Sequence, residues 1–182
     1  MSGELEDDQP DDTPLSGQDT TRFRAVTDRC NYMGCDRPDC SYPIKECCQE
    51  MSSPTSGSLR RITRIAKYLK AHPRLVWKFD MQAHTDILNI FTDDDWAGCR
   101  RKSTSGGSVM LGGHCLNTWS KTQAVIAKSS AESELYGVVR GACEGLGLRT
   151  LLRDLGEDVQ IRLNLDDTAA KGMLERQGIA KF

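Results

Sequence analysis

The sequence predicts a mixed α/β fold, in which helices pack on a sheet that contains both antiparallel and parallel strands. Residues 159–165 alternate apolar and polar side chains with the period of two that is typical of a strand. Residues 108–111 and 115–119 flank Gly112-Gly113, which favours an antiparallel hairpin because glycine accepts the backbone angles of a tight turn. A long helical pattern separates this hairpin from the last strand, and a strand, a helix and a further strand imply a right-handed crossover between parallel strands.

The first third of the chain is expected to be an acidic tail followed by helices. Residues 1–21 form the tail, because residues 1–20 hold seven acids and few apolar side chains that could offset the entropy of ordering. Residues 22–74 form a helical connection segment, with a short helix at residues 44–51 and a longer one at residues 59–71, where apolar side chains recur at helical spacing. Residues 75–182 then form the main domain, and two compact domains are not expected in 182 residues.

The main domain is expected to begin with two strands, at residues 75–79 and 87–92. The long helix starts at Ser129 or Ser130, either of which can cap it, and ends near Gly156. Its first turn contains Glu132 and Glu134, and helical periodicity does not decide which of these acids faces a site. A short helix is expected at residues 168–177.

Charge is distributed unevenly along the chain, although the net charge is only −2. The first 20 residues contain no Lys or Arg, so the rest of the chain is mildly basic. Residues 59–78 contain seven basic residues and no acid, a concentration that attracts a phosphate backbone, although a helix solvated on one face has a similar composition. No apolar run is long enough to span a bilayer and the N-terminus lacks a signal-peptide pattern, so we expect an intracellular protein, cytoplasmic or nuclear, that is not secreted and has no membrane partner.

Five of the eight cysteines lie within residues 30–48. Without a secretory signal, reduced thiols are expected. A zinc-binding module in this stretch is an alternative, but Cys30, Cys35 and Cys40 are each separated by four residues and no histidine lies near them.

Three groups of acidic residues fall at the ends of predicted elements: one follows the strand at residues 87–92, one opens the long helix, and one closes the last strand. Carboxylates from separate elements supply the oxygen ligands that Mg²⁺ prefers, whereas a solvated acidic turn would explain the first group equally well. The groups are Asp93-Asp94-Asp95, Glu132 with Glu134, and Asp166-Asp167.

Four short motifs follow one another in the second half of the chain: Asp93-Asp94-Asp95-Trp96-Ala97-Gly98, Arg101-Lys102-Ser103-Thr104-Ser105-Gly106, Trp119-Ser120-Lys121-Thr122-Gln123 and Ser129-Ser130-Ala131-Glu132-Ser133-Glu134. In this order and spacing they resemble the ribonuclease H domain of copia-type retrotransposon polyproteins. The resemblance covers residues 75–182. Segments upstream of it resemble the connection between reverse transcriptase and ribonuclease H, and no Tyr-x-Asp-Asp polymerase motif occurs.

This resemblance implies a ribonuclease H-like fold and endonucleolytic hydrolysis of the RNA strand of RNA–DNA hybrids by two-metal-ion catalysis. It matches Asp93, Glu134 and Asp166 to catalytic, metal-binding carboxylates, with two Mg²⁺ ions as cofactors and Mn²⁺ as a substitute. Expected partners are the hybrid, recognised by shape and phosphates, and the reverse transcriptase part of the same polyprotein. The candidate nucleic-acid-binding residues are Arg60, Arg61, Arg64, Lys67, Arg100, Arg101 and Lys102.

The sequence departs from the family's pattern at three places. Other members carry a different residue where Asp94 stands, and many have an amide or hydroxyl residue at the position of Asp167. The family's fourth carboxylate follows a segment that resembles residues 176–181, whereas this sequence ends at Phe182. We therefore expect a C-terminally truncated domain, from a fragment or a decayed copy, that cleaves poorly. The alternative function is a catalytically inactive nucleic-acid-binding remnant or scaffold of a transposable-element polyprotein.

Overall fold

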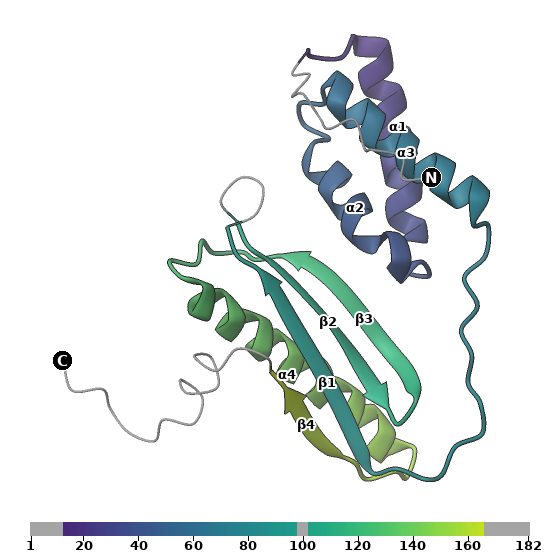
Figure 1. Ribbon diagram of the computed structural model, residues 1–182, viewed down its shortest axis with the longest axis vertical. Coiled ribbons are helices and arrows are strands. Elements are labelled where there is room, and N and C mark those ends of the chain that lie inside the picture. Colours follow the sequence, from purple (N-terminus) through teal and green to yellow (C-terminus); the bar gives the residue numbers. More distant parts are fainter. Residues whose placement is uncertain (1–12, 98–101, 166–182) are drawn as a thin grey trace, which may run out of the picture. The chain divides into compact units, whose positions relative to one another are not determined.

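The computed structural model describes residues 13–97 and 102–165. The chain divides between Val76 and Trp77 into two compact units, called here the N-terminal and C-terminal units (Figure 1). The expectation of a single compact domain is therefore wrong. The physical reason is that the helices before residue 77 bury a hydrophobic core of their own, separate from the core of the sheet. Among the described residues, no helix is both long enough and apolar enough to cross a bilayer.

The N-terminal unit consists of three helices: α1 (Gly17–Met33), α2 (Pro38–Gln49) and α3 (Ser56–Ala71). The Ser16 side chain caps α1 by accepting a hydrogen bond from the Asp19 amide at 3.2 Å. The Leu15 amide also donates to the Pro54 carbonyl at 3.1 Å. The tail expected at residues 1–21 therefore extends too far, because its last five residues already belong to α1.

The core of the N-terminal unit contains three cysteines together with aliphatic and aromatic side chains. Residues 22–51 were expected to contain one helix, at residues 44–51, but they contain most of α1 and all of α2. Pro38 is the first residue of α2, a position where proline is well tolerated. Burial raises the pKa of the Cys47 thiol to about 12 and also raises that of Cys30. The buried residues are Phe23, Cys30, Cys40, Ile44, Cys47, Ile62 and Ile65.

The C-terminal unit is a four-stranded mixed sheet with one long helix on it, as the sequence predicts, and it is compatible with a ribonuclease H-like fold. The strand order is β3-β2-β1-β4, with β1–β2 and β2–β3 antiparallel and β1–β4 parallel. Figure 1 shows α4 running across one face of this sheet. The elements are β1 (Ile87–Asp95), β2 (Thr104–Leu111), β3 (His114–Thr122), α4 (Ser130–Asp154) and β4 (Gln160–Asn164).

Residues 72–86 contain no strand, so the strand expected at residues 75–79 is wrong. The alternation there has no neighbouring strand to pair with, and Val76 and Phe79 are 79% and 59% exposed. Alternating side chains indicate a strand only where a sheet edge supplies hydrogen bonds. The helix expected at residues 168–177 lies outside the described residues.

Three glycines on α4 allow the helix to approach β1 closely. They are spaced four residues apart and therefore lie on one face of the helix. A Cβ atom built at Gly141 would lie 2.6 Å from Thr92 Cγ2, and one at Gly145 would overlap Ile90 Cδ1. Gly137, one turn closer to the N-terminus of α4, continues the same face. Glycine is therefore required here for space, and the close approach fixes how α4 lies along β1.

Candidate functional site

The acidic run Asp93-Asp94-Asp95 forms the last three residues of β1 and does not lie in the turn after it. Strand side chains alternate between the two faces of a sheet, and Leu88, Ile90 and Thr92 are buried under α4. Asp94 continues this buried series. Asp93 and Asp95 are exposed and belong to the opposite face. The run therefore supplies one half-buried and two exposed carboxylates.

The Asp94 carboxylate is held by donors from two other elements. Asp94 Oδ1 accepts hydrogen bonds from Ser105 Oγ and, at 2.8 Å, from Gln123 Nε2. Asp94 Oδ2 has no hydrogen-bond partner and lies against Gly137. Burial is the largest influence on this group and raises its pKa to about 6; the nearby charge of Asp93 adds to the rise, and the two hydrogen bonds oppose it.

Gln123 links this carboxylate to α4. Its Nε2 atom lies 2.9 Å from Ser105 Oγ, 2.9 Å from the Ser133 carbonyl oxygen and 3.1 Å from Ser133 Oγ. The backbone amide of Gln123 donates to the Ser103 carbonyl at 2.8 Å, which fixes the point from which the side chain extends. The Asp94 cluster, defined as Asp94, Ser105, Gln123 and Ser133, thus joins β1, β2, the end of β3 and the first turn of α4.

The two acids in the first turn of α4 occupy different environments, which periodicity did not resolve. Ser129 caps the helix by accepting a hydrogen bond from the Glu132 amide at 3.2 Å. Glu132 accepts from the Lys128 amide at 2.7 Å and from Tyr136 Oη at 3.3 Å, so it holds the helix entrance. Glu134 is only 8% exposed, on the inner side of the helix.

The end of β1 lies beside the end of β4. The two strands pair in parallel, and the register places Phe91 opposite Asn164. The Asn164 side chain donates to the Ile90 carbonyl at 3.3 Å, which holds the end of β4 against β1. The third predicted site residue, Asp166, lies outside the described residues, so the convergence of all three acids stays a prediction. Within residues 13–97 and 102–165, no three acidic, histidine or cysteine side chains gather as a group that could hold a metal ion.

The predicted nucleic-acid-binding residues separate into three sets. Arg60, Arg64 and Lys67 are exposed and recur at helical spacing along one face of α3. Arg61 instead forms an ion pair with Glu50 and joins α3 to α2. Lys102 belongs to the C-terminal unit, where its Nζ atom donates to the Ala124 carbonyl at 3.4 Å. Arg100 and Arg101 lie outside the described residues.

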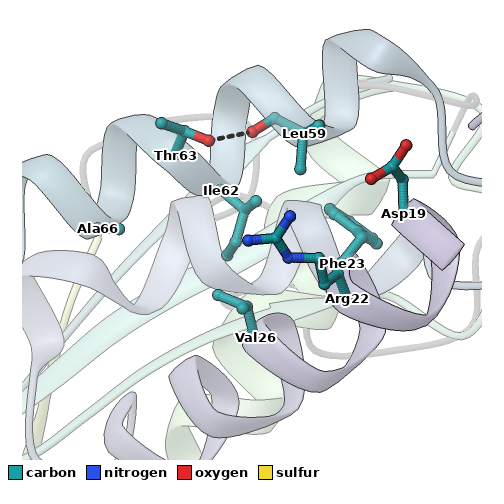
Figure 2. A pocket seen from close by; sticks show the side chains of 8 residues that line it. All are labelled: Asp19, Arg22, Phe23, Val26, Leu59, Ile62, Thr63 and Ala66. Carbon is teal, nitrogen blue, oxygen red and sulfur yellow. Dashed lines mark hydrogen bonds between the residues drawn. The ribbon is translucent and has the colours of Figure 1, made fainter.

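A groove of about 360 Å³ lies between α1 and α3 within the N-terminal unit (Figure 2). Its walls are mainly apolar, and Asp19 is the single carboxylate among the residues that line it. A metal-dependent hydrolase needs several carboxylates in one place, so this groove is not the candidate site. The lining residues are Asp19, Arg22, Phe23, Val26, Leu59, Ile62, Thr63 and Ala66.

The Asp94 cluster was not predicted, since Asp94 was noted from the sequence as one member of the acidic group Asp93-Asp94-Asp95 and as a departure from the family pattern. One signal was available: Leu88, Ile90 and Thr92 recur with a period of two, and the same period places Asp94 on the apolar face if the strand continues to residue 95. The contribution of Gln123 had no such signal, because its partners lie 10 to 29 residues away in the sequence.

Comparison with known proteins finds relatives among transposon polyproteins. The chain is 34% identical over 140 residues to "Retrovirus-related Pol polyprotein from transposon RE1" of Arabidopsis thaliana, a match that covers 76% of this chain and 10% of the polyprotein. The corresponding polyprotein from transposon RE2 is 32% identical over 140 residues, again 10% of its length. "Secreted RxLR effector protein 161" of Plasmopara viticola is 31% identical over 119 residues, which cover 64% of this chain and 83% of that protein. No family model and no solved structure matches.

Proposed function

From the similarity of this chain to retrovirus-related Pol polyproteins of transposons RE1 and RE2, we propose that its C-terminal unit is a ribonuclease H-type endonuclease that hydrolyses the RNA strand of RNA–DNA hybrids. The observation that carries the proposal is the parallel register of β1 and β4, which pairs Phe91 with Asn164. Asp93 follows the first of these residues by two positions, and Asp166 follows the second by two positions.

The site would be formed by Asp93, Glu134 and Asp166. Their carboxylate oxygens are the donors that Mg²⁺ and Mn²⁺ accept. Asp93 is exposed at the end of β1 and therefore open to an ion, and it is the best candidate to contact two ions. Glu134 lies in the first turn of α4, which packs on β1. Asp93 and Glu134 would be two of the three ligands, and Asp166 would be the third. Bound ions would stabilise charge on the attacking and leaving oxygens of the phosphodiester.

Hybrid binding would use phosphate contacts rather than base edges. Arg60, Arg64 and Lys67 present an exposed basic face on α3, and this face supports binding to a backbone of phosphates. Arg61 is assigned a structural contact instead, because it is paired with Glu50. Lys102, with Arg100 and Arg101, would supply a second set of contacts.

The proposal is tested by cleavage of a hybrid whose RNA strand carries a 5′ label, in Mg²⁺ and in Mn²⁺. Asp93→Asn is compared with Asp95→Asn, a matched control that removes the same charge from the same exposed face of β1. Asp93→Asn should lower the cleavage rate by about a hundredfold or more, the factor expected when charge stabilisation worth a few kcal/mol is lost. Asp95→Asn should cleave at nearly the wild-type rate.

Two results would contradict the proposal. Equal cleavage by wild type and Asp93→Asn would show that the activity does not arise at this site. Salt-dependent hybrid binding with no metal-dependent cleavage would instead support an inactive nucleic-acid-binding remnant. In either case, circular dichroism should first show that the variants keep the wild-type fold, so that the comparison reports chemistry.

A further inference from the structure

The Gln123 side chain is 8% exposed and contacts three different elements. Its amide nitrogen carries two hydrogens, yet four acceptor atoms lie within hydrogen-bond distance of it, between 2.8 and 3.1 Å. One of these acceptors is Asp94 Oδ1, which belongs to the second-last residue of β1. Two others belong to Ser133 in the first turn of α4. A single donor group therefore connects the two places in the chain that carry Asp93 and Glu134.

We propose that Gln123 is a positioning residue that fixes the first turn of α4, and with it the Glu134 carboxylate, against the end of β1 that carries Asp93. The metal-binding role of these two carboxylates rests on the proposed function. The fixing of the turn does not, because it follows from the hydrogen bonds alone.

The chemistry at this position requires a donor of the length of glutamine. The Ser133 carbonyl oxygen and Asp94 Oδ1 both accept hydrogen bonds from Gln123 Nε2. A side chain at residue 123 without an N–H or O–H group would therefore leave both acceptors without this donor. Ser133 is fully buried, so water cannot replace the lost donor there. The Gln123 backbone is itself held by the Ser103 carbonyl, so the side chain extends from a fixed point.

The hydrogen bonds from Gln123 to Ser133 join the first turn of α4 to the Asp94 and Ser105 side chains of the sheet. The bonds of Glu132 go to Lys128 and Tyr136, which both belong to the helix or its entrance. Further along α4, the glycine face packs closely against β1, and Glu144 accepts a hydrogen bond from Asn117 of β3 at 3.3 Å. Loss of Gln123 should therefore loosen the first turn selectively.

The test is hydrogen exchange followed by mass spectrometry on Gln123→Leu, with Gln82→Leu as the matched control. Gln82 donates to the Leu111 carbonyl at 2.9 Å and accepts from the Gly113 amide at 2.8 Å, so its loss removes side-chain amide contacts at the opposite end of β2. In Gln123→Leu, amides of residues 134–138 should exchange about tenfold faster, with residues 148–152 unchanged. Gln82→Leu should leave both segments at wild-type rates.

A second readout separates positioning from simple loss of stability. Mn²⁺ binding to the full chain, followed by electron paramagnetic resonance, should weaken about tenfold in Gln123→Leu and remain unchanged in Gln82→Leu. Wild-type exchange in residues 134–138 of Gln123→Leu would overturn the positioning role. If the wild-type chain binds no Mn²⁺ but residues 134–138 still exchange faster in Gln123→Leu, the metal site of the proposed function is overturned. The role of Gln123 in fixing the turn is then still supported.

Should Gln123→Leu fail to fold, Ser133→Ala provides the same test in a milder form. It removes one of the four acceptors and keeps the carbonyl contact, so exchange of residues 134–138 should rise by about threefold. An unchanged rate in that variant would contradict the proposal.

Discussion

The Asp94 carboxylate on β1 lies directly against Gly137 on α4, so that a Cβ atom at residue 137 would overlap Asp94 Oδ2. This contact occurs between two residues 43 positions apart, and it places an acid where the rest of the face is apolar. The buried Oδ2 atom has no hydrogen-bond partner. The pair therefore links the packing of α4 to the protonation of a carboxyl group.

Gly137→Ala should destabilise the C-terminal unit by about 1–3 kcal/mol, because the added methyl group forces Asp94 or the helix to move. Gly147→Ala is the matched control on the same helix, since nothing lies within 4 Å of a Cβ atom there. It should stabilise the unit by about 0.5–1 kcal/mol through helix propensity. Urea unfolding measures both.

Combining Gly137→Ala with Asp94→Ala should recover most of the lost stability, because the second change removes the atoms that the methyl group meets. A double-mutant cycle gives the coupling directly. Additive effects of the two substitutions would contradict the contact.

The stability of the wild-type chain should depend on pH through Asp94. Its folded pKa of about 6 lies above the ordinary value of 3.8, so between these values the folded chain holds a proton that the unfolded chain has released. The free energy of unfolding therefore falls as pH rises from about 4 to about 6. Asp94→Asn cannot ionise, so its stability relative to wild type should rise by about 1–3 kcal/mol over this range. A constant difference at all pH values would contradict the assignment.

Two neighbouring arginines on α3 should respond differently to substitution. Arg64→Ala should weaken hybrid binding uniformly across sequences and reduce the slope of log affinity against log salt by about 1, because an exposed phosphate contact is lost. Arg61→Ala should mainly lower the stability of the N-terminal unit, because Glu50 loses its partner. Fluorescence anisotropy at several salt concentrations separates the two, and identical salt slopes in wild type and Arg64→Ala would refute the phosphate contact.

Local sequence patterns predicted the elements that short stretches of sequence specify: glycines in a turn, a capping serine and the alternation of apolar and polar side chains in a strand. The hairpin around Gly112, the Ser129 cap of α4 and the alternation of β4 all appear in the structure. The alternation at residues 75–79 did not produce a strand, because pairing depends on a neighbouring strand that periodicity cannot reveal.

The site was predictable to a smaller extent, for a physical reason. The motifs pointed to Asp93 and Glu134, but the burial of Glu134 relative to Glu132 depends on how α4 packs on β1, and periodicity does not contain that information. Gln123 contributes through contacts with three elements, β1, β2 and α4. Such contacts arise only when the chain has folded.

We propose that Asp166 completes the metal site with Asp93 and Glu134, and two single substitutions at adjacent positions test this role. The rate of metal-dependent hybrid cleavage should be compared between Asp166→Asn and Asp167→Asn, which remove one charge from adjacent positions. We expect the rate to fall by about a hundredfold or more for Asp166→Asn and to change little for Asp167→Asn. Equal rates in the two variants, or a greater loss in Asp167→Asn, would contradict it.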